Sequence, residues 1–156
     1  MNRKKSNKNC VFCKIARGEL PSYKIWEDKK HLAFLSIFPN TEGFSVVITK
    51  KHYSSYAFAQ SDKIVFDLVL ASKKVAKRLD ASLKDVGRTG MILEGFGIDH
   101  LHAKLFPMHG TKMKKWKPIK SKVNKYFKKY EGYISSHDYR REDDAKLEKL
   151  TKKIRR

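Results

Sequence analysis

Two histidines and a lysine alternate with apolar residues in the second half of the chain, as His100, His102 and Lys104. In an extended strand, alternate side chains project from the same face, so these three groups are expected to share one surface. A neutral imidazole is a nucleophile and a proton carrier near pH 7, and a neighbouring ammonium attracts phosphate. The spacing therefore indicates nucleophilic attack on a phosphate, with a polar strand surface as the alternative interpretation.

Cys10 and Cys13 are the two cysteines of the chain. One short-range pair cannot form a disulfide framework, so the pair indicates either a metal site or free thiols in a reducing compartment. The basic N-terminus is not followed by the apolar core of a signal peptide, and no stretch approaches the roughly 20 apolar residues of a membrane span. We therefore expect a cytoplasmic protein that does not associate with membranes.

The elements that must position these groups can be predicted from hydrophobic periodicity. Residues 14–21 are expected to form a short helix or turn, and Ser61 is the expected N-cap of a helix over 62–84. Aromatic and branched residues predict strands over 23–28, 31–37, 43–49, 90–94 and 98–106. Three strands, a helix and two more strands predict an α+β fold with one antiparallel sheet and one main helix.

The net charge of +20 is concentrated at the two ends of the chain. Residues 1–9 carry +4 and residues 111–156 carry +11, which leaves +5 for residues 10–110. We therefore divide the chain into a basic disordered tail over 1–9, a folded domain over 10–110 and a Lys-rich extension over 111–156. The extension is expected to form an amphipathic helix within 112–130 and a charged helix over 139–156. Such basic ends favour nucleic acid or other polyanions, or they are solvated tails.

The segment GFGIDHLHAKLFP resembles the histidine triad (HIT) motif, in which histidines alternate with apolar residues. The segments CVFCKIARGELPSYKIWED and HLAFLSIFPNTEGFSVVITKKHY resemble the N-terminal half of the same family, so the similarity runs from about Cys10 to His109. The resemblance implies a five-stranded antiparallel sheet with a main helix, and two subunits that pair as a homodimer. It also implies hydrolysis or transfer of nucleotides through a covalent nucleotidyl-histidine, which by position forms on His102.

The resemblance also implies the residues of the site. Catalysis would fall to His102 and Lys104, and a structural zinc would be held by Cys10, Cys13, His52 and His100. The nucleotide would be bound by Ser36, Ile37, Phe96, Gly97, Ile98 and His109. Alternative functions are a nucleic-acid-end enzyme that removes a 5′ adenylate and a non-catalytic nucleotide-binding protein.

Three positions depart from the family pattern. Lys104 stands at the third histidine, and lysine does not shuttle protons at neutral pH unless its pKa is strongly lowered; His109 or water would then have to protonate the leaving group. Ser36 replaces an aspartate that binds ribose hydroxyls, and it offers a hydrogen bond without the charge. Phe96-Gly97 replaces a Gln-Ser or Gln-Thr pair that contacts phosphate, and Phe96 is expected to stack on a ring of the substrate.

Overall fold

The computed structural model describes residues 7–135, 140–142 and 145. The chain divides into two compact units, Met1–Trp116 and Lys117–Arg156. Most of the predicted helix over 139–156 lies outside the described residues, which include only 140–142 and 145 of it. Residues 1–6 of the predicted N-terminal tail also lie outside them. Residues 7–9 form a turn in which the Cys10 N–H donates to the Asn7 carbonyl.

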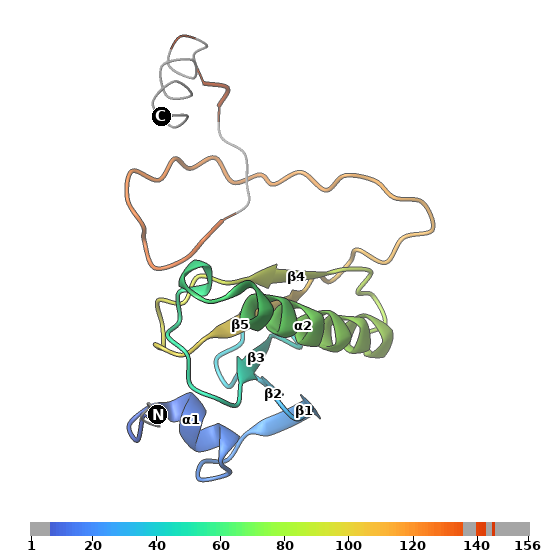
Figure 1. Ribbon diagram of the computed structural model, residues 1–156. Helices are drawn as coiled ribbons and strands as arrows, with labels where there is room; N and C mark the ends of the chain where they lie inside the picture. The colour runs from blue at the N-terminus through green and yellow to red at the C-terminus, as the bar shows by residue number, and fades with distance from the viewer. Residues whose placement is uncertain (1–6, 136–139, 143–144, 146–156) are drawn as a thin grey trace. The chain divides into compact units, whose positions relative to one another are not determined.

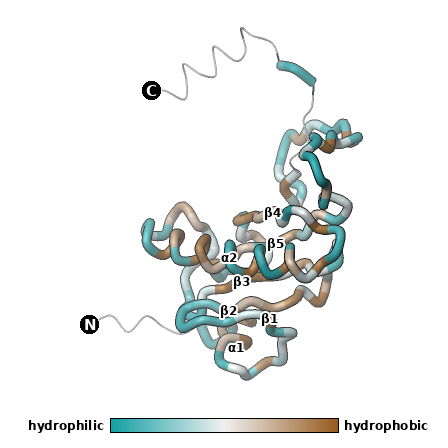
Figure 2. The backbone as a smooth tube through the Cα atoms, turned by 90° about the vertical axis from the view of Figure 1, so that its right-hand side faces the viewer, coloured by the Kyte–Doolittle hydropathy of each residue, from teal (hydrophilic) through white to brown (hydrophobic). Residues whose placement is uncertain are grey.

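Five antiparallel strands form one sheet, which confirms the predicted α+β fold with its main helix (Figure 1). The strands are β1 (Tyr23–Glu27), β2 (His31–Leu35), β3 (Ser45–Thr49), β4 (Thr89–Ile92) and β5 (His102–Pro107), in the spatial order β1-β2-β3-β5-β4. The central strand is β3, with β2 on one side and β5 on the other, so the histidine strand lies inside the sheet and β1 and β4 are its edges. Figure 2 colours β3 as strongly hydrophobic, as expected for a strand buried on both faces.

One face of the sheet is covered by α2 (Asp62–Ser82), which packs chiefly on β5 and β3. Its buried stripe is Leu68, Ala71, Ser72, Val75 and Leu79, at helical spacing. Ser61 is the N-cap residue as predicted, although its side chain makes no capping hydrogen bond. The helix ends at Ser82, before the predicted residue 84, and Leu83 turns toward Gly43, where an added Cβ would lie 2.9 Å from the leucine.

The other face is covered by α1 (Val11–Ala16), a short helix close to the sequence position expected for one. Phe12 and Cys13 of α1 pack with Leu32, Phe34, Val46 and Ile48, which point away from α2. His102 and Lys104 point to the same side, because Ala103 and Leu105 between them pack with the α2 cluster. No helix among the described residues has the length and apolarity required to cross a bilayer.

Two predictions about the elements are wrong. The last strand begins at His102 rather than at residue 98, so His100 precedes the strand. Residues 112–130 contain no helix. Pro118 lacks the N–H of a helix interior, nine lysines repel one another at helical spacing, and the side chains of Trp116, Ile119 and Val123 are exposed rather than packed on an apolar surface.

Candidate active site and metal centre

His102 is oriented by the backbone just before it. Its Nδ1 lies 2.6 Å from the carbonyl oxygen of His100, so Nδ1 carries the proton and Nε2 carries the lone pair. Burial lowers the pKa of His102 and the charge of Lys104 lowers it further, while the His100 hydrogen bond and Glu94 oppose the shift. The ring is therefore neutral near pH 7, as a nucleophile requires.

The His102 side chain is covered in this structure, with 4% of its surface exposed. The ring of Phe12 packs edge-on against it, with ring centroids 5.1 Å apart. Its surroundings are not wholly apolar, because the charges of Lys104 and Glu94 both act on it. Phe12 therefore shields much of the His102 ring from solvent.

Lys104 forms an ion pair with Glu94, a residue that sequence reasoning missed. The side chain of Glu94 is 7% exposed and that of Lys104 is 28% exposed. The signal available in the sequence was an acidic residue at the end of a predicted strand, directly before the glycines that precede the histidines. The structure therefore adds a buried carboxylate to the group of His102 and Lys104.

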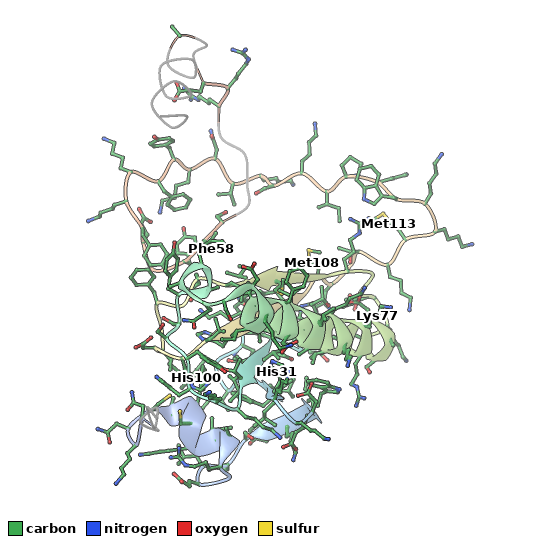
Figure 3. All side chains as sticks on the ribbon, in the orientation of Figure 1. His31, Phe58, Lys77, His100, Met108 and Met113 are labelled. Carbon is green, nitrogen blue, oxygen red and sulfur yellow. The ribbon has the colours of Figure 1, made fainter. Side chains whose placement is uncertain are left out.

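The four predicted metal ligands lie together, although they are up to 90 residues apart in sequence. The ligand atoms of Cys10, Cys13, His52 and His100 all lie within 4.8 Å of one another. His100 Nδ1 is 3.4 Å from Cys10 Sγ and 3.3 Å from His52 Nδ1, and Cys13 Sγ is 3.4 Å from His52 Nδ1. Among the described residues, this cluster could hold a metal ion, and Figure 3 shows His100 near α1, which carries Cys13.

His100 is held in the form that binds a metal through Nδ1. Its Nε2 lies 2.6 Å from the carbonyl oxygen of Thr49, so Nε2 donates a hydrogen bond and Nδ1 presents its lone pair to the thiols. Burial lowers the pKa of His100 to about 4, so its ring is neutral. The same residue accepts the hydrogen bond of His102 through its carbonyl. His100 thus joins the Cys/His cluster through its ring and orients His102 through its backbone carbonyl.

The structure distributes the predicted nucleotide-binding residues over two loops. Ser36 and Ile37 follow β2, where the Ser36 hydroxyl accepts a hydrogen bond from the Phe38 N–H. Phe96 and Gly97 follow β4; the Phe96 side chain is 81% exposed and the space around Gly97 is open. Ile98 in the second loop is half-buried and packs with the cluster that contains Phe12.

His109 lies away from His102, beyond the opposite end of β5. His102 begins this strand and Pro107 ends it, a separation of about 16 Å at the usual rise of a strand. The His109 ring bonds Asp85 at 2.8 Å and the Glu42 carbonyl at 3.0 Å. These two bonds raise the pKa of His109. The structure therefore does not bring His109 close to His102.

A cavity of about 440 Å³ lies at another place in the domain. It is lined in part by four lysines, Lys29, Lys30, Lys50 and Lys51. Lys30 and Lys50 are already paired with Asp67 and Glu27. The lining includes neither His102 nor Lys104, so this cavity does not extend the catalytic group.

The histidine strand β5 lies inside the antiparallel sheet, between β3 and the edge strand β4. Residues 17–111 match the HIT domain family, and the chain belongs to this family. The adenosine 5′-monophosphoramidase of Schizosaccharomyces pombe is 35% identical over 100 residues, which cover 64% of this chain and 74% of that enzyme.

Solved structures show the same fold. A protein from Streptococcus mutans superposes with a TM-score of 0.69 at 26% identity, covering 99% of this chain and 88% of that one. A zinc-bound histidine triad protein from Mycobacterium smegmatis superposes with a TM-score of 0.60 at 25% identity, covering 64% of this chain and 74% of that one. The family and its relatives support nucleotide hydrolase activity.

Proposed function

We propose that this protein is a nucleotide-phosphate hydrolase or nucleotidyl transferase that works through a covalent nucleotidyl-histidine on His102. The observation that carries the proposal is the hydrogen bond from His102 Nδ1 to the His100 carbonyl, because it leaves the lone pair on Nε2. The lowered pKa of His102 keeps that lone pair available at neutral pH. The similarity to an adenosine phosphoramidase supports an adenine nucleotide as substrate.

The reaction has two steps. Nε2 of His102 attacks the α-phosphorus, a nitrogen–phosphorus bond forms, and the bond to the leaving group breaks with its electron pair. Water or another acceptor then attacks the same phosphorus and releases the nucleotide from Nε2. Two such displacements replace one difficult step, and Lys104 contributes its charge to the phosphoryl oxygens.

We propose that the nucleotide lies between the two loops that carry Ser36, Ile37, Phe96, Gly97 and Ile98. Phe96 is exposed and offers a ring for stacking on the base. Open space around Gly97 leaves room for a ligand next to its backbone. Because His109 is bonded to Asp85 and Glu42, we assign it no contact with the phosphate under attack.

We further propose that the four-residue cluster holds a structural zinc ion. Ligands at about 2.0–2.3 Å from a tetrahedral zinc lie roughly 3.3–3.8 Å from one another. Four of the six pairs of ligand atoms from Cys10, Cys13, His52 and His100 are 3.3–3.5 Å apart, and all six lie within 4.8 Å. A zinc-bound relative of the same fold supports this assignment. With four protein ligands the ion has no open position, so its role is structural.

The proposed mechanism is tested by trapping the intermediate. We expect a nucleoside monophosphate attached to His102 when the protein is mixed with adenosine 5′-phosphoramidate or diadenosine tetraphosphate and quenched in alkali. Peptide mass spectrometry would locate the adduct. Nucleotide binding without an adduct under any of these conditions would instead favour a non-catalytic nucleotide-binding protein.

A second candidate function is the processing of nucleic-acid ends, such as removal of a 5′ adenylate. Residues 112–130 contain nine lysines and no acidic residue, and they form neither helix nor strand. The side chains of Trp116 and Tyr126 are exposed among these lysines. Aromatic rings and cations in one open segment suit the stacked bases and phosphates of a single strand.

This candidate predicts binding that depends steeply on salt. Each lysine–phosphate contact with a single strand contributes a slope of about 0.7 to log K against log salt. Changing Lys120, Lys122 and Lys125 to glutamine should therefore reduce the slope by about 2, measured with a fluorescent single-stranded RNA. The same change at Lys63, Lys73 and Lys77 on α2 is the matched control (Lys77 is labelled in Figure 3). Equal effects of both triple variants, or binding indifferent to salt, would count against this candidate.

A cytoplasmic location stays a prediction from the sequence.

We propose that the functional assembly is a homodimer. The edge strand β4 is open to pairing. Met91 on β4 and Phe66 and Leu70 on α2 are large apolar side chains that are exposed in the single chain. Light scattering should give twice the 18.2 kDa mass of the chain, and a mass of one chain at micromolar concentration would reject the dimer.

A further inference from the structure

The pairing of β4 with β5 places Glu94 beside Lys104. Ile92, the last residue of β4, is the register partner of Lys104, and Glu94 follows two residues later, where its carboxylate pairs with the Lys104 ammonium. Gly95 then turns the chain with a φ of +70°, and a side chain there would lie 2.8 Å from the Ser55 carbonyl. Only glycine meets both demands, so the backbone fixes the position at which Glu94 enters the site.

The carboxylate of Glu94 holds the ammonium of Lys104 at the nucleophile. His102 and Lys104 are alternate residues of β5 and project from the same face of the sheet, so the ion pair lies beside the His102 ring. A lysine ammonium has three N–H donors. One of them contacts Glu94 Oε1, which leaves two donor directions for the oxygens of a phosphoryl group. The buried carboxylate also keeps the flexible lysine stem from extending into solvent.

An ammonium is a far weaker proton donor than an imidazolium, so Lys104 assists a leaving group chiefly through its charge. An imidazole at the same position gives up a proton more readily and regains it near neutral pH. A nitrogen leaving group must gain a proton as its bond to phosphorus breaks, because an amide anion is too basic to depart. A phosphate leaving group departs as a stable anion and needs no proton.

We propose that the Glu94–Lys104 pair determines leaving-group specificity and makes this protein prefer phosphoanhydrides to phosphoramidates. Lys104 contacts the reacting phosphoryl group, and Glu94 is a positioning residue that acts through it. The inference rests on the proposed role of His102. In the favoured reaction, Nε2 of His102 forms the bond to the α-phosphorus, the bridging phosphorus–oxygen bond breaks, and the oxygen keeps the electron pair as part of the leaving phosphate.

The first test restores an imidazole at the third position. We measure kcat/KM for diadenosine tetraphosphate and for adenosine 5′-phosphoramidate with the wild-type protein and with Lys104→His. The wild-type protein should favour the anhydride, and Lys104→His should reduce that preference at least about tenfold, which is only part of the roughly 10²–10⁴-fold that a well-positioned proton donor contributes. An unchanged preference, or a wild-type preference for the phosphoramidate, would overturn the inference.

The second test separates positioning from folding. Adenosine 5′-aryl phosphates with phenols of graded acidity give the slope of log kcat/KM against leaving-group acidity. Lys104→His should make the dependence shallower, because a proton donor helps poor leaving groups most. Glu94→Gln should make it steeper, because the ammonium is no longer held at the phosphoryl oxygens. A purely structural role for Glu94 would lower all rates together and leave the slope unchanged.

Glu27→Gln is the matched control for Glu94→Gln, and the activity of the wild-type protein separates failure of the proposed function from failure of the inference about the ion pair. Glu27→Gln makes the same chemical change in an ion pair on the edge strand β1, where Glu27 contacts Lys24 and Lys50. Glu27→Gln should leave both the slope and the substrate preference unchanged. Wild-type protein that cleaves none of the probes would reject the proposed function, whereas cleavage with identical slopes in all variants would reject only the role of the Glu94–Lys104 pair.

Discussion

Replacing His102 by alanine should lower the release of nucleoside monophosphate at least about a thousandfold, because the change removes the atom that attacks phosphorus. The loss should appear in kcat with every leaving group, since all of them pass through the same intermediate. Steady-state release of AMP from diadenosine tetraphosphate measures it. A rate within a few fold of the wild type would remove His102 from the reaction.

Two controls show that the loss is chemical rather than structural. His102→Gln keeps a polar side chain against Phe12 and should be equally inactive, while circular dichroism and the thermal midpoint stay near those of the wild type. The pH profile of the wild type adds a second check. Because the pKa of His102 is lowered, its acidic limb should fall below the value of about 6.5 for a free imidazole, and a limb above that value would contradict a buried neutral nucleophile.

Removing the metal should lower both stability and activity. A strong chelator, or Cys13→Ser, should reduce the thermal midpoint by on the order of 10 °C, because an ion that binds only the folded chain stabilises it by mass action. Activity should fall by about tenfold to a hundredfold, since a shift of His100 moves the carbonyl that orients His102. Calorimetry measures the midpoint, and elemental analysis should find one zinc per chain before treatment.

A second buried histidine provides the control for metal binding. His31 is buried and bonded to Asp28 rather than to the thiols, so His31→Gln should keep its metal while His52→Gln should lose it. Readdition of zinc should restore the midpoint of the chelated protein. Protein that contains no metal as purified, with a midpoint indifferent to chelator, would reject the zinc assignment.

Much of this arrangement could be predicted from the residues themselves. The period of two in β5 and of about 3.6 in α2 comes from burial on one side, so both elements and the antiparallel sheet followed from the pattern. The start of β5 could not be predicted in this way. His100 is polar and alternates with His102, but its ring turns toward the cysteines and its backbone leaves the strand.

The helix predicted within 112–130 was wrong and Glu94 was missed, because tertiary contacts, which the sequence pattern does not show, decide both. The apolar residues of 112–130 have a helical pattern, yet their exposed side chains show that the pattern alone does not stabilise a helix of this length. Glu94 carries no sequence motif, and its importance emerges only when β4 pairs with β5. The metal cluster was expected from family resemblance, because no periodicity relates Cys10 to a histidine 90 residues away.

The alternation along β5 has a practical consequence for protein engineering. His102 and Lys104 project from the face proposed for the chemistry, and Ala103 and Leu105 pack beneath α2. A library that randomises position 104 therefore samples the proposed specificity, whereas one that randomises 103 and 105 samples stability. A one-residue insertion in β5 would exchange the two sets and bring a charged ammonium under the helix. Loop grafts ahead of His102 must therefore preserve the frame of the strand, whatever their length.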